Sequence, residues 1–104
     1  MHNMKVCMNH PAYVIVNVNI TNPEQYDQYR VFSSQAMTEH NAEILVRGGR
    51  QVILEGAFYP RTVIMKFASM EKAQAFYDSQ TYKKGRELRK DAAVANMVIV
   101  EGLI

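Results

Sequence analysis

The stretch AYVIVNVNITNPEQYDQYR, residues 12–30, decides the fold because it runs directly from a strand pattern into a helix start. Residues 12–20 are rich in β-branched side chains and alternate in character, which predicts a β-strand. Asn22 is a good N-cap residue, Pro23 suits the first helical position, and Glu24 complements the positive end of a helix. A strand followed at once by a helix is therefore expected at the start of the domain.

The predicted helix after Pro23 has one face that is expected to point inward. On that face, small, aromatic and other side chains recur at spacings of three and four: Tyr26, Tyr29, Ser33, Ala36, Met37 and His40. We expect the helix to stop near Asn41, because asparagine tolerates the left-handed conformation that ends many helices.

The remaining sequence continues with strand and helix patterns. Ser69 is placed to cap a second helix, and a break at Ser79-Gln80 leads into a further helical piece. Two extended runs separated by a Gly pair are predicted at residues 43–47 and 50–55 and are counted as one interrupted strand, and further strands are predicted at residues 61–67 and 96–103. The order β-α-β-β-α-β predicts an α+β, ferredoxin-like fold with the helices on one face of an antiparallel sheet. We expect a single domain at residues 12–104, after a flexible N-terminal tail at residues 1–11.

The two faces of the predicted sheet bear on assembly. Val14, Val16 and Val18 share one side of the first strand, which we assign to the helices. The opposite face is predicted to hold apolar residues among Asn, Lys and Glu: Tyr13, Ile15, Ile64, Met97 and Ile99. A two-layer domain leaves this face uncovered, and large apolar patches usually mark interaction surfaces. A homodimer through the sheet face is therefore expected.

Composition limits the classes of function. The chain has 104 residues, 48% of them apolar, and a formal net charge of +2, which fits one globular domain. We expect no membrane span and no secretory signal, because no apolar run is long enough. The basic run KKGRELRK at residues 83–90 is interpreted as a solvated helix face, so nucleic-acid binding is not expected. A single cysteine fits a reducing compartment and predicts a cytoplasmic location.

The segment Arg47-Gly48-Gly49-Arg50 invites comparison with a phosphate-binding loop. Such a loop needs a helix directly after the glycines, whereas a strand is predicted at residues 50–55. Two interpretations stay open: a bend or bulge between two stretches of strand, and a substrate contact by Arg47. Arginine would suit a carboxylate through a bidentate contact.

Other candidate site residues are polar groups on the predicted helices and first strand. His40 is either a general acid or base, or a histidine that interacts with free carbonyls at a helix end. Tyr29 and Tyr82 are either core residues or ligand-binding hydroxyls. Asn17 is a candidate for lining a cavity on the covered sheet face, and Ser79 is most simply a helix cap.

Metal and cofactor sites are not expected. The residues His2, Cys7 and His10 fit no zinc spacing. The sequence also has no Gly-x-Ser-x-Gly, no Cys-x-x-Cys and no dinucleotide-binding fingerprint. We therefore predict neither a bound metal nor a bound cofactor.

Several motifs together resemble the family called domain of unknown function 1330. They are AYVIVNVNITNPEQYDQYR, LVRGG, VILEG, KFASMEKAQAFYDSQTY and VIVEG, and they extend from about Ala12 to Gly102. The resemblance implies the dimeric α/β-barrel superfamily. Members of that superfamily include cofactor-independent monooxygenases, muconolactone isomerases and haem-degrading enzymes, but the resemblance implies no established activity.

The chain departs from the family pattern at three places. His40-Asn41-Ala42 stands where the family has Tyr-Gly-Gly, Phe67-Ala68 where it has Phe-Pro, and Ser79-Gln80-Thr81-Tyr82 where it has Ser-Pro-Glu-Tyr. Two functional hypotheses follow. The chain is either a cofactor-independent small-molecule enzyme of the isomerase or monooxygenase type, or a non-catalytic dimer that binds a ligand or serves as a structural module.

Overall fold

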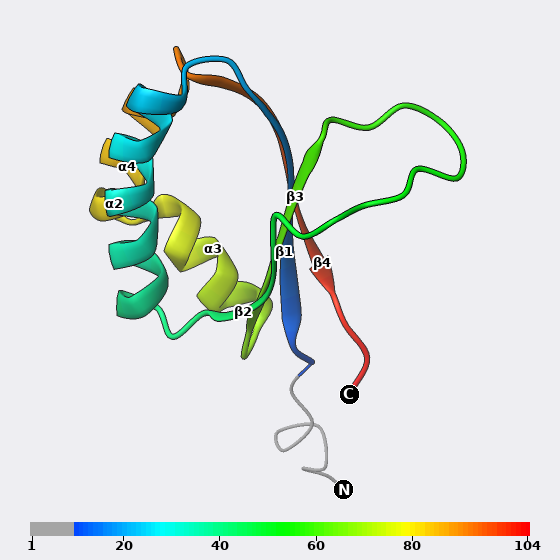
Figure 1. The fold of residues 1–104 in the computed structure, drawn as a ribbon. Coiled ribbons are helices and arrows are strands. Elements are labelled where there is room, and N and C mark those ends of the chain that lie inside the picture. The colour runs from blue at the N-terminus through cyan, green and yellow to red at the C-terminus, as the bar shows by residue number, and fades with distance from the viewer. Residues whose placement is uncertain (1–9) are drawn as a thin grey trace, which may run out of the picture.

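The computed structural model describes residues 10–104, and it confirms the predicted ferredoxin-like α+β fold. Helices cover one face of a single four-stranded antiparallel sheet with strand order β2-β3-β1-β4 (Figure 1). The elements are β1 (Ala12–Ile20), α2 (Pro23–Glu39), β2 (Glu43–Arg47), β3 (Arg61–Phe67), α3 (Met70–Asp78), α4 (Gln80–Arg89) and β4 (Ala93–Glu101). Residues 10 and 11 already contact the domain, since His10 Nδ1 and the Pro11 carbonyl each form a hydrogen bond with Gly102.

The ends of the helices follow the predicted signals. The Asn22 side chain accepts a hydrogen bond of 3.2 Å from the Gln25 N–H and caps α2. At the other end Asn41 has a φ of 56°, so the chain leaves the helix in the left-handed conformation as expected. Ser69 caps α3, and Ser79 caps α4 by accepting a hydrogen bond of 3.1 Å from the Tyr82 N–H.

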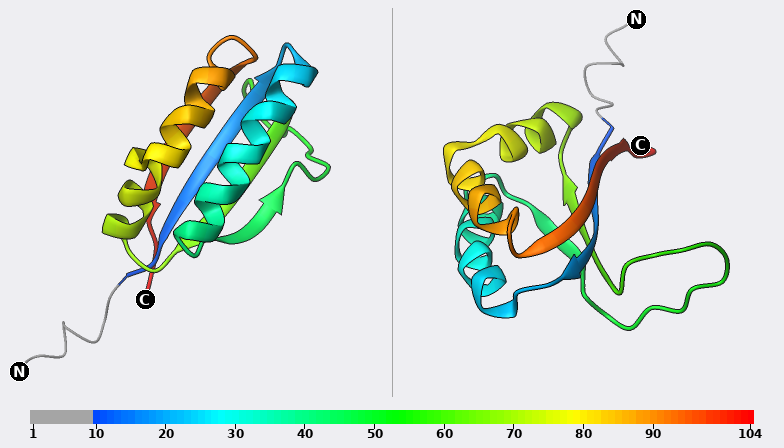
Figure 2. Two further views of the ribbon diagram at one scale, coloured as in Figure 1. Left: turned by 90° about the vertical axis from the view of Figure 1, so that its left-hand side faces the viewer. Right: turned by 90° about the horizontal axis from the view of Figure 1, so that it is seen from above.

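The core lies between the sheet and the helices. Val14, Val16 and Val18 point from β1 toward the helices and are buried, as the alternation predicted. Tyr82 and Phe76 are the large side chains that cover them from α4 and α3, and their ring centroids lie 4.6 Å apart. α2 and α4 run side by side across the sheet (Figure 2).

The face assignment that we made for the last strand is wrong. Met97 and Ile99 lie opposite Val16 and Val14 in the register of β1 with β4, so they pack on the helix side. Val98 belongs instead to the open face, together with two other valines that are about half exposed: Val94 and Val100. The strand also begins and ends earlier than residues 96–103. The open face therefore keeps its apolar character: Ile15 and Ile64 lie there as predicted, and the valines of β4 take the place of Met97 and Ile99.

The strand predicted at residues 50–55 is also not formed. Residues 48–60 form a long irregular segment, here called the arm, that projects from the sheet on the side away from the helices (Figure 1; Figure 2). β3 already pairs with β1 on one edge and β2 on the other, so residues 50–55, which lie in the connection from β2 to β3, cannot add a strand beside β3. The arm exposes large apolar side chains: Val52, Ile53, Leu54 and Phe58.

Candidate functional site

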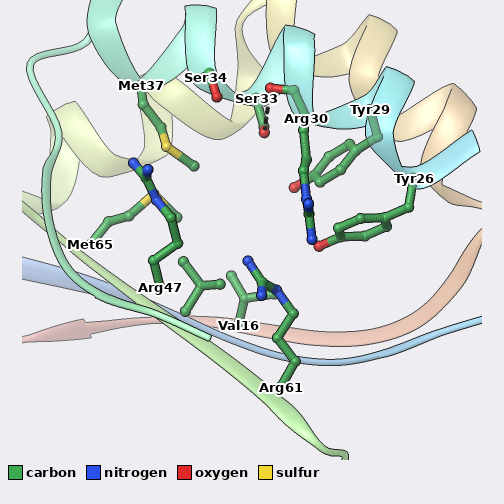
Figure 3. Close-up of a pocket in the computed structure, with 11 residues that line it drawn as sticks. Val16, Tyr26, Tyr29, Arg30, Ser33, Ser34, Met37, Arg47, Arg61 and Met65 are labelled. Atoms are coloured by element: carbon green, nitrogen blue, oxygen red, sulfur yellow. Dashed lines mark hydrogen bonds between the residues drawn. The ribbon is translucent and has the colours of Figure 1, made fainter. Parts of the chain in front are cut away.

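A pocket of about 220 Å3 lies between α2 and the sheet. Its roof is the inward face of α2 and its floor consists of side chains from β1, β2 and β3 (Figure 3). The residues that argue for a function are polar: Tyr26, Tyr29, Arg30, Arg47 and Arg61. Valine and methionine side chains form the rest of the floor and part of the roof, so the pocket combines an apolar base with polar walls.

Arg61 reaches the pocket because it continues the inward face of β3. Val63 and Met65 point toward the helices, and Arg61 is the next residue on that side of the strand. Its side chain is half-buried and passes over the backbone of Gly48. The Nε of Arg61 is buried and has no hydrogen-bond partner among the described residues. Arg61 was not among the residues expected from the sequence to form a site, although its spacing of two residues from Val63 was a usable signal.

Arg47 reaches the same pocket through an irregularity in β2. The pairing of β2 with β3 shifts between Ile44 and Val46, which indicates a β-bulge. As a result Ile44 and Arg47, three residues apart, both lie opposite inward-facing residues of β3. Figure 3 shows the guanidinium group of Arg47 pointing into the pocket from the sheet. This bulge lies before the Gly pair, and residues 50–55 form no strand, so Gly48-Gly49 is not the expected bend or bulge between two stretches of strand; Gly48, with a φ of 67°, turns the chain out of β2. A substrate contact by Arg47 stays a prediction.

The pocket carries an unbalanced positive charge. Arg30, Arg47 and Arg61 all line it, and none of the described lining residues is acidic. Within residues 10–104, Arg30 forms an exposed ion pair with Asp27 at 3.3 Å, while Arg47 and Arg61 form none. An exposed pair of this kind neutralises little charge, because water screens it. The site is therefore electrostatically suited to an anion.

Two tyrosines of α2 border the arginines. The Arg30 guanidinium lies 5.1 Å from the centroid of the Tyr26 ring. Burial raises the pKa of the Tyr26 hydroxyl and the neighbouring Tyr29 adds to this, while Arg61 and Arg30 act in the opposite direction. Figure 3 shows the hydroxyl of Tyr29 pointing toward the middle of the pocket. The Tyr26 hydroxyl is thus available in neutral form at physiological pH.

Behind Tyr29 lies a buried group of polar side chains. The Tyr29 hydroxyl is 2.8 Å from the Tyr82 hydroxyl, and the Arg89 Nη1 donates a hydrogen bond of 2.8 Å to the Tyr82 oxygen. Burial raises the pKa of the Tyr82 hydroxyl well above its ordinary range, and Tyr29 adds to the rise while Arg89 opposes it. Tyr82 is fully buried and does not line the pocket.

The other predicted site residues lie apart from the pocket. His40 caps the end of α2, with its ring 6.3 Å from that of Phe76. Ser79 serves as a helix cap. Asn17 lies on the opposite face of the sheet, where its Nδ2 donates to the Tyr59 carbonyl at 3.0 Å and its Oδ1 accepts from the Tyr59 N–H at 2.8 Å. Of the six candidates, the structure brings only Arg47 and Tyr29 together around the pocket, with Tyr82 directly behind.

The described part of the chain contains no group of three or more His, Cys, Asp or Glu side chains that could hold a metal ion. His2 and Cys7, considered above for metal binding, lie outside the described residues. No helix in residues 10–104 is long and apolar enough to cross a membrane.

Comparison with known proteins places the chain in a family and a fold. A family model described as a domain of unknown function (DUF1330) matches residues 11–103. RPA0582, a protein of unknown function from Rhodopseudomonas palustris, is similar over 100% of this chain and 96% of its own, with 14% identity and a TM-score of 0.74. No match was found among curated proteins.

Two further solved structures share the fold. SnoaB, a cofactor-independent oxygenase from Streptomyces nogalater, aligns over 88% of this chain and 91% of its own, with 3% identity and a TM-score of 0.56. A dimeric ferredoxin-like protein of unknown function from Thermobifida fusca aligns over 92% of each chain, with 12% identity and a TM-score of 0.54. At these identities the similarity concerns the fold alone.

Proposed function

We propose that this chain, which belongs to the DUF1330 family, is a cofactor-independent enzyme. It binds a small organic oxyanion in the pocket beneath α2. The ligand class is a carboxylate, an enolate or a phenolate on a compact apolar body. A volume of about 220 Å3 admits only a small molecule, because pockets for drug-sized ligands occupy roughly 300–1,000 Å3.

The observation that carries this proposal is the set of three arginines without an acidic residue among the described lining residues. Guanidinium groups bind carboxylates and related oxyanions through charge-assisted hydrogen bonds. The Arg61 Nε is buried and has no hydrogen-bond partner among the described residues, so no protein group there compensates that part of the guanidinium. A cluster of cations that served only stability would be expected to have acidic partners within the pocket, because like charges repel one another.

The same arrangement supports catalysis on the ligand. Arginine and tyrosine donors directed at one point stabilise negative charge that develops on an oxygen atom, as happens when a carbonyl compound enolises. Enolisation is the common first requirement of isomerisation and of oxygenation at a carbon next to a carbonyl group. The fold shared with SnoaB adds support for the oxygenase type of reaction, although that similarity is confined to the fold.

A non-catalytic ligand-binding protein is the second candidate. One observation favours it: none of the described lining residues is a histidine, aspartate or glutamate, so the pocket lacks the usual general bases. His40, which could have served as a base, lies at the end of α2 and does not line the pocket. An enzyme built on this pocket would rely on a substrate that is already acidic.

The binding proposal is tested by titration of the protein with benzoate and with benzamide, its neutral analogue of similar shape. We expect benzoate to bind and benzamide to bind much more weakly. Arg47→Ala is expected to weaken benzoate binding roughly 10- to 100-fold, the value of one hydrogen bond to a charged group. Arg50→Ala is the matched control, because Arg50 is exposed and does not line the pocket. Equal affinity for both compounds, or equal effects of both substitutions, would contradict the proposal.

Catalysis is tested separately. The protein is incubated with a series of small β-keto acids and hydroquinones, which are acidic and oxidisable, and oxygen consumption and proton exchange at carbon are followed. Turnover that is lost in Arg47→Ala supports the enzyme. Binding without turnover across the series would favour the non-catalytic candidate.

We also propose that two chains associate through their open sheet faces. Val94 and Val98 are 50% and 51% exposed on that face, and Leu54 of the arm is 88% exposed. Together with the other apolar side chains of the arm they form a surface that a single subunit leaves in water. The structural similarity to a dimeric ferredoxin-like protein supports the same association. Sedimentation at micromolar concentration is expected to show a dimer.

A further inference from the structure

The hydrogen bonds that link Arg89, Tyr82 and Tyr29 behind the pocket, here called the hydrogen-bond chain, have a defined order of donors and acceptors. Arg89 donates to the Tyr82 oxygen at 2.8 Å, and the Tyr82 oxygen lies 2.8 Å from the Tyr29 oxygen. A guanidinium group has donors only, so Arg89 cannot accept a hydrogen bond from the Tyr82 hydroxyl. The Tyr82 hydroxyl must therefore direct its own proton away from Arg89.

Two acceptors are available to that proton. One is the Tyr29 oxygen at 2.8 Å, and the other is the Met97 sulfur at 3.6 Å. The oxygen lies at the ordinary distance for a hydrogen bond between hydroxyls, whereas a thioether sulfur is a weak acceptor. The hydrogen bond therefore runs from Tyr82 to Tyr29, and the Tyr29 oxygen is occupied as an acceptor.

We propose that Arg89 and Tyr82 are positioning residues that turn the Tyr29 hydroxyl into a hydrogen-bond donor directed into the pocket. The inference rests on the proposed function, because it gives the pocket's ligand an oxygen acceptor at the position of Tyr29. The Tyr29 oxygen already accepts the hydrogen bond from Tyr82. Its own O–H therefore points away from Tyr82, into the pocket between α2 and the sheet (Figure 3). This hydrogen-bond chain thereby favours an acceptor, above all a carbonyl or oxyanion, at that point over a group such as ammonium that has donors only.

The surroundings hold this chain in place. The Arg89 guanidinium stacks near both rings, 5.4 Å from the Tyr29 centroid and 5.9 Å from the Tyr82 centroid. Tyr82 is fully buried, so water does not compete for its hydroxyl. Consecutive hydrogen bonds in a low dielectric also strengthen one another, which makes Tyr29 a better donor than an isolated phenol. No step of the arrangement needs a cofactor.

The direction of the chain is measured first without a ligand. In the protein labelled with 13C tyrosine, the proton between the two hydroxyl oxygens is assigned by NMR through its correlation to the ring that bears it. We expect this proton on Tyr82, with a second, solvent-exchanging hydroxyl proton on Tyr29. In Arg89→Met the bridging signal is expected to shift or broaden. Lys84→Met is the matched control, since Lys84 lies on the same helix but is exposed.

The second arm uses 4-nitrophenolate and nitrobenzene, a probe pair that differs only in the oxyanion. Tyr82→Phe is expected to weaken 4-nitrophenolate binding roughly two- to fivefold, the size of the cooperative strengthening, and to leave nitrobenzene binding unchanged. Tyr29→Phe is expected to weaken it roughly tenfold by removing the donor itself. Because Tyr82 acts through Tyr29, its substitution is expected to have no further effect in the Tyr29→Phe background.

The outcomes separate the two proposals. A bridging proton on Tyr29 overturns the directed chain, whether or not an anion binds. An effect of Tyr82→Phe that persists undiminished in the Tyr29→Phe background also overturns it. If the parent protein bound neither probe but the bridging proton belonged to Tyr82, the anion-binding function would fail while the direction of the chain would stand.

Discussion

Replacement of Gly48 by alanine tests the link between the turn after β2 and the pocket. Gly48 has a φ of +67°, a conformation that side chains disfavour. A Cβ at this position would also overlap the Nη1 of Arg61 and approach its Cζ to 2.7 Å. The Arg61 guanidinium therefore lies where it does because residue 48 has no side chain, and Gly48→Ala is expected to push it aside.

The magnitude of the effect has two parts. The left-handed conformation costs a residue with a β-carbon about 1–2 kcal/mol, so the free energy of unfolding is expected to fall by that amount. Displacement of Arg61 removes one charge-assisted contact and is expected to weaken benzoate binding roughly tenfold. Urea denaturation and calorimetric titration measure the two parts separately.

Gly49→Ala is the matched control for this experiment. A Cβ at Gly49 would meet no atom within 4 Å, and Gly49 does not have a positive φ. We expect this variant to bind benzoate like the parent and to be as stable or about 0.4–1 kcal/mol more stable. If Gly48→Ala lost stability but kept full benzoate affinity, the inferred dependence of Arg61 on Gly48 would be refuted. If it lost neither, the conformation assigned to the turn would be refuted as well.

Three further predictions concern other parts of the molecule. Asn17→Ala, which removes the hydrogen bonds that hold the base of the arm, is expected to lower the free energy of unfolding by about 1–3 kcal/mol in denaturation experiments; Asn19→Ala on the same face is expected to have little effect. Val98→Glu on the open sheet face is expected to shift sedimentation toward a monomer, whereas Val31→Glu on the exposed side of α2 is not. Burial raises the pKa of Tyr82 above its ordinary value of 10.0, so the unfolded chain releases this proton first and the free energy of unfolding is expected to fall as the pH rises above about 10. Tyr82→Phe is expected to flatten that fall, and an unchanged slope would contradict the raised pKa of Tyr82.

Local signals were sufficient wherever neighbouring residues decide the conformation. The Asn22-Pro23-Glu24 start and the Asn41 end of α2 were both predicted, because caps and left-handed exits depend on a few adjacent residues. The same holds for the caps Ser69 and Ser79. The alternation of β1 likewise identified its inward face, since Val14, Val16 and Val18 alternate with positions that include asparagines.

The errors arose where both choices were locally acceptable. In β4 each face carries apolar residues, so alternation separates two sets without saying which one faces the helices. The register with β1 decides, because Met97 lies opposite the inward-facing Val16. Residues 50–55 have the composition of a strand, but a strand also needs an edge within reach to pair with, and both edges of the adjoining β3 are already paired.

From the sequence alone came the order of the elements, the ferredoxin-like fold and the family resemblance, together with Arg47 and Tyr29 as candidate residues. The tertiary structure alone decided which candidates meet. Strict alternation from Ile44 would place Val46 on the inward side of β2, and the bulge places Arg47 there instead. The tertiary structure also brings Arg61 from β3 and Arg30 from α2 to the same pocket. The physical reason is that a pocket is formed by residues far apart in the chain, whose positions depend on strand register and helix packing rather than on their immediate neighbours.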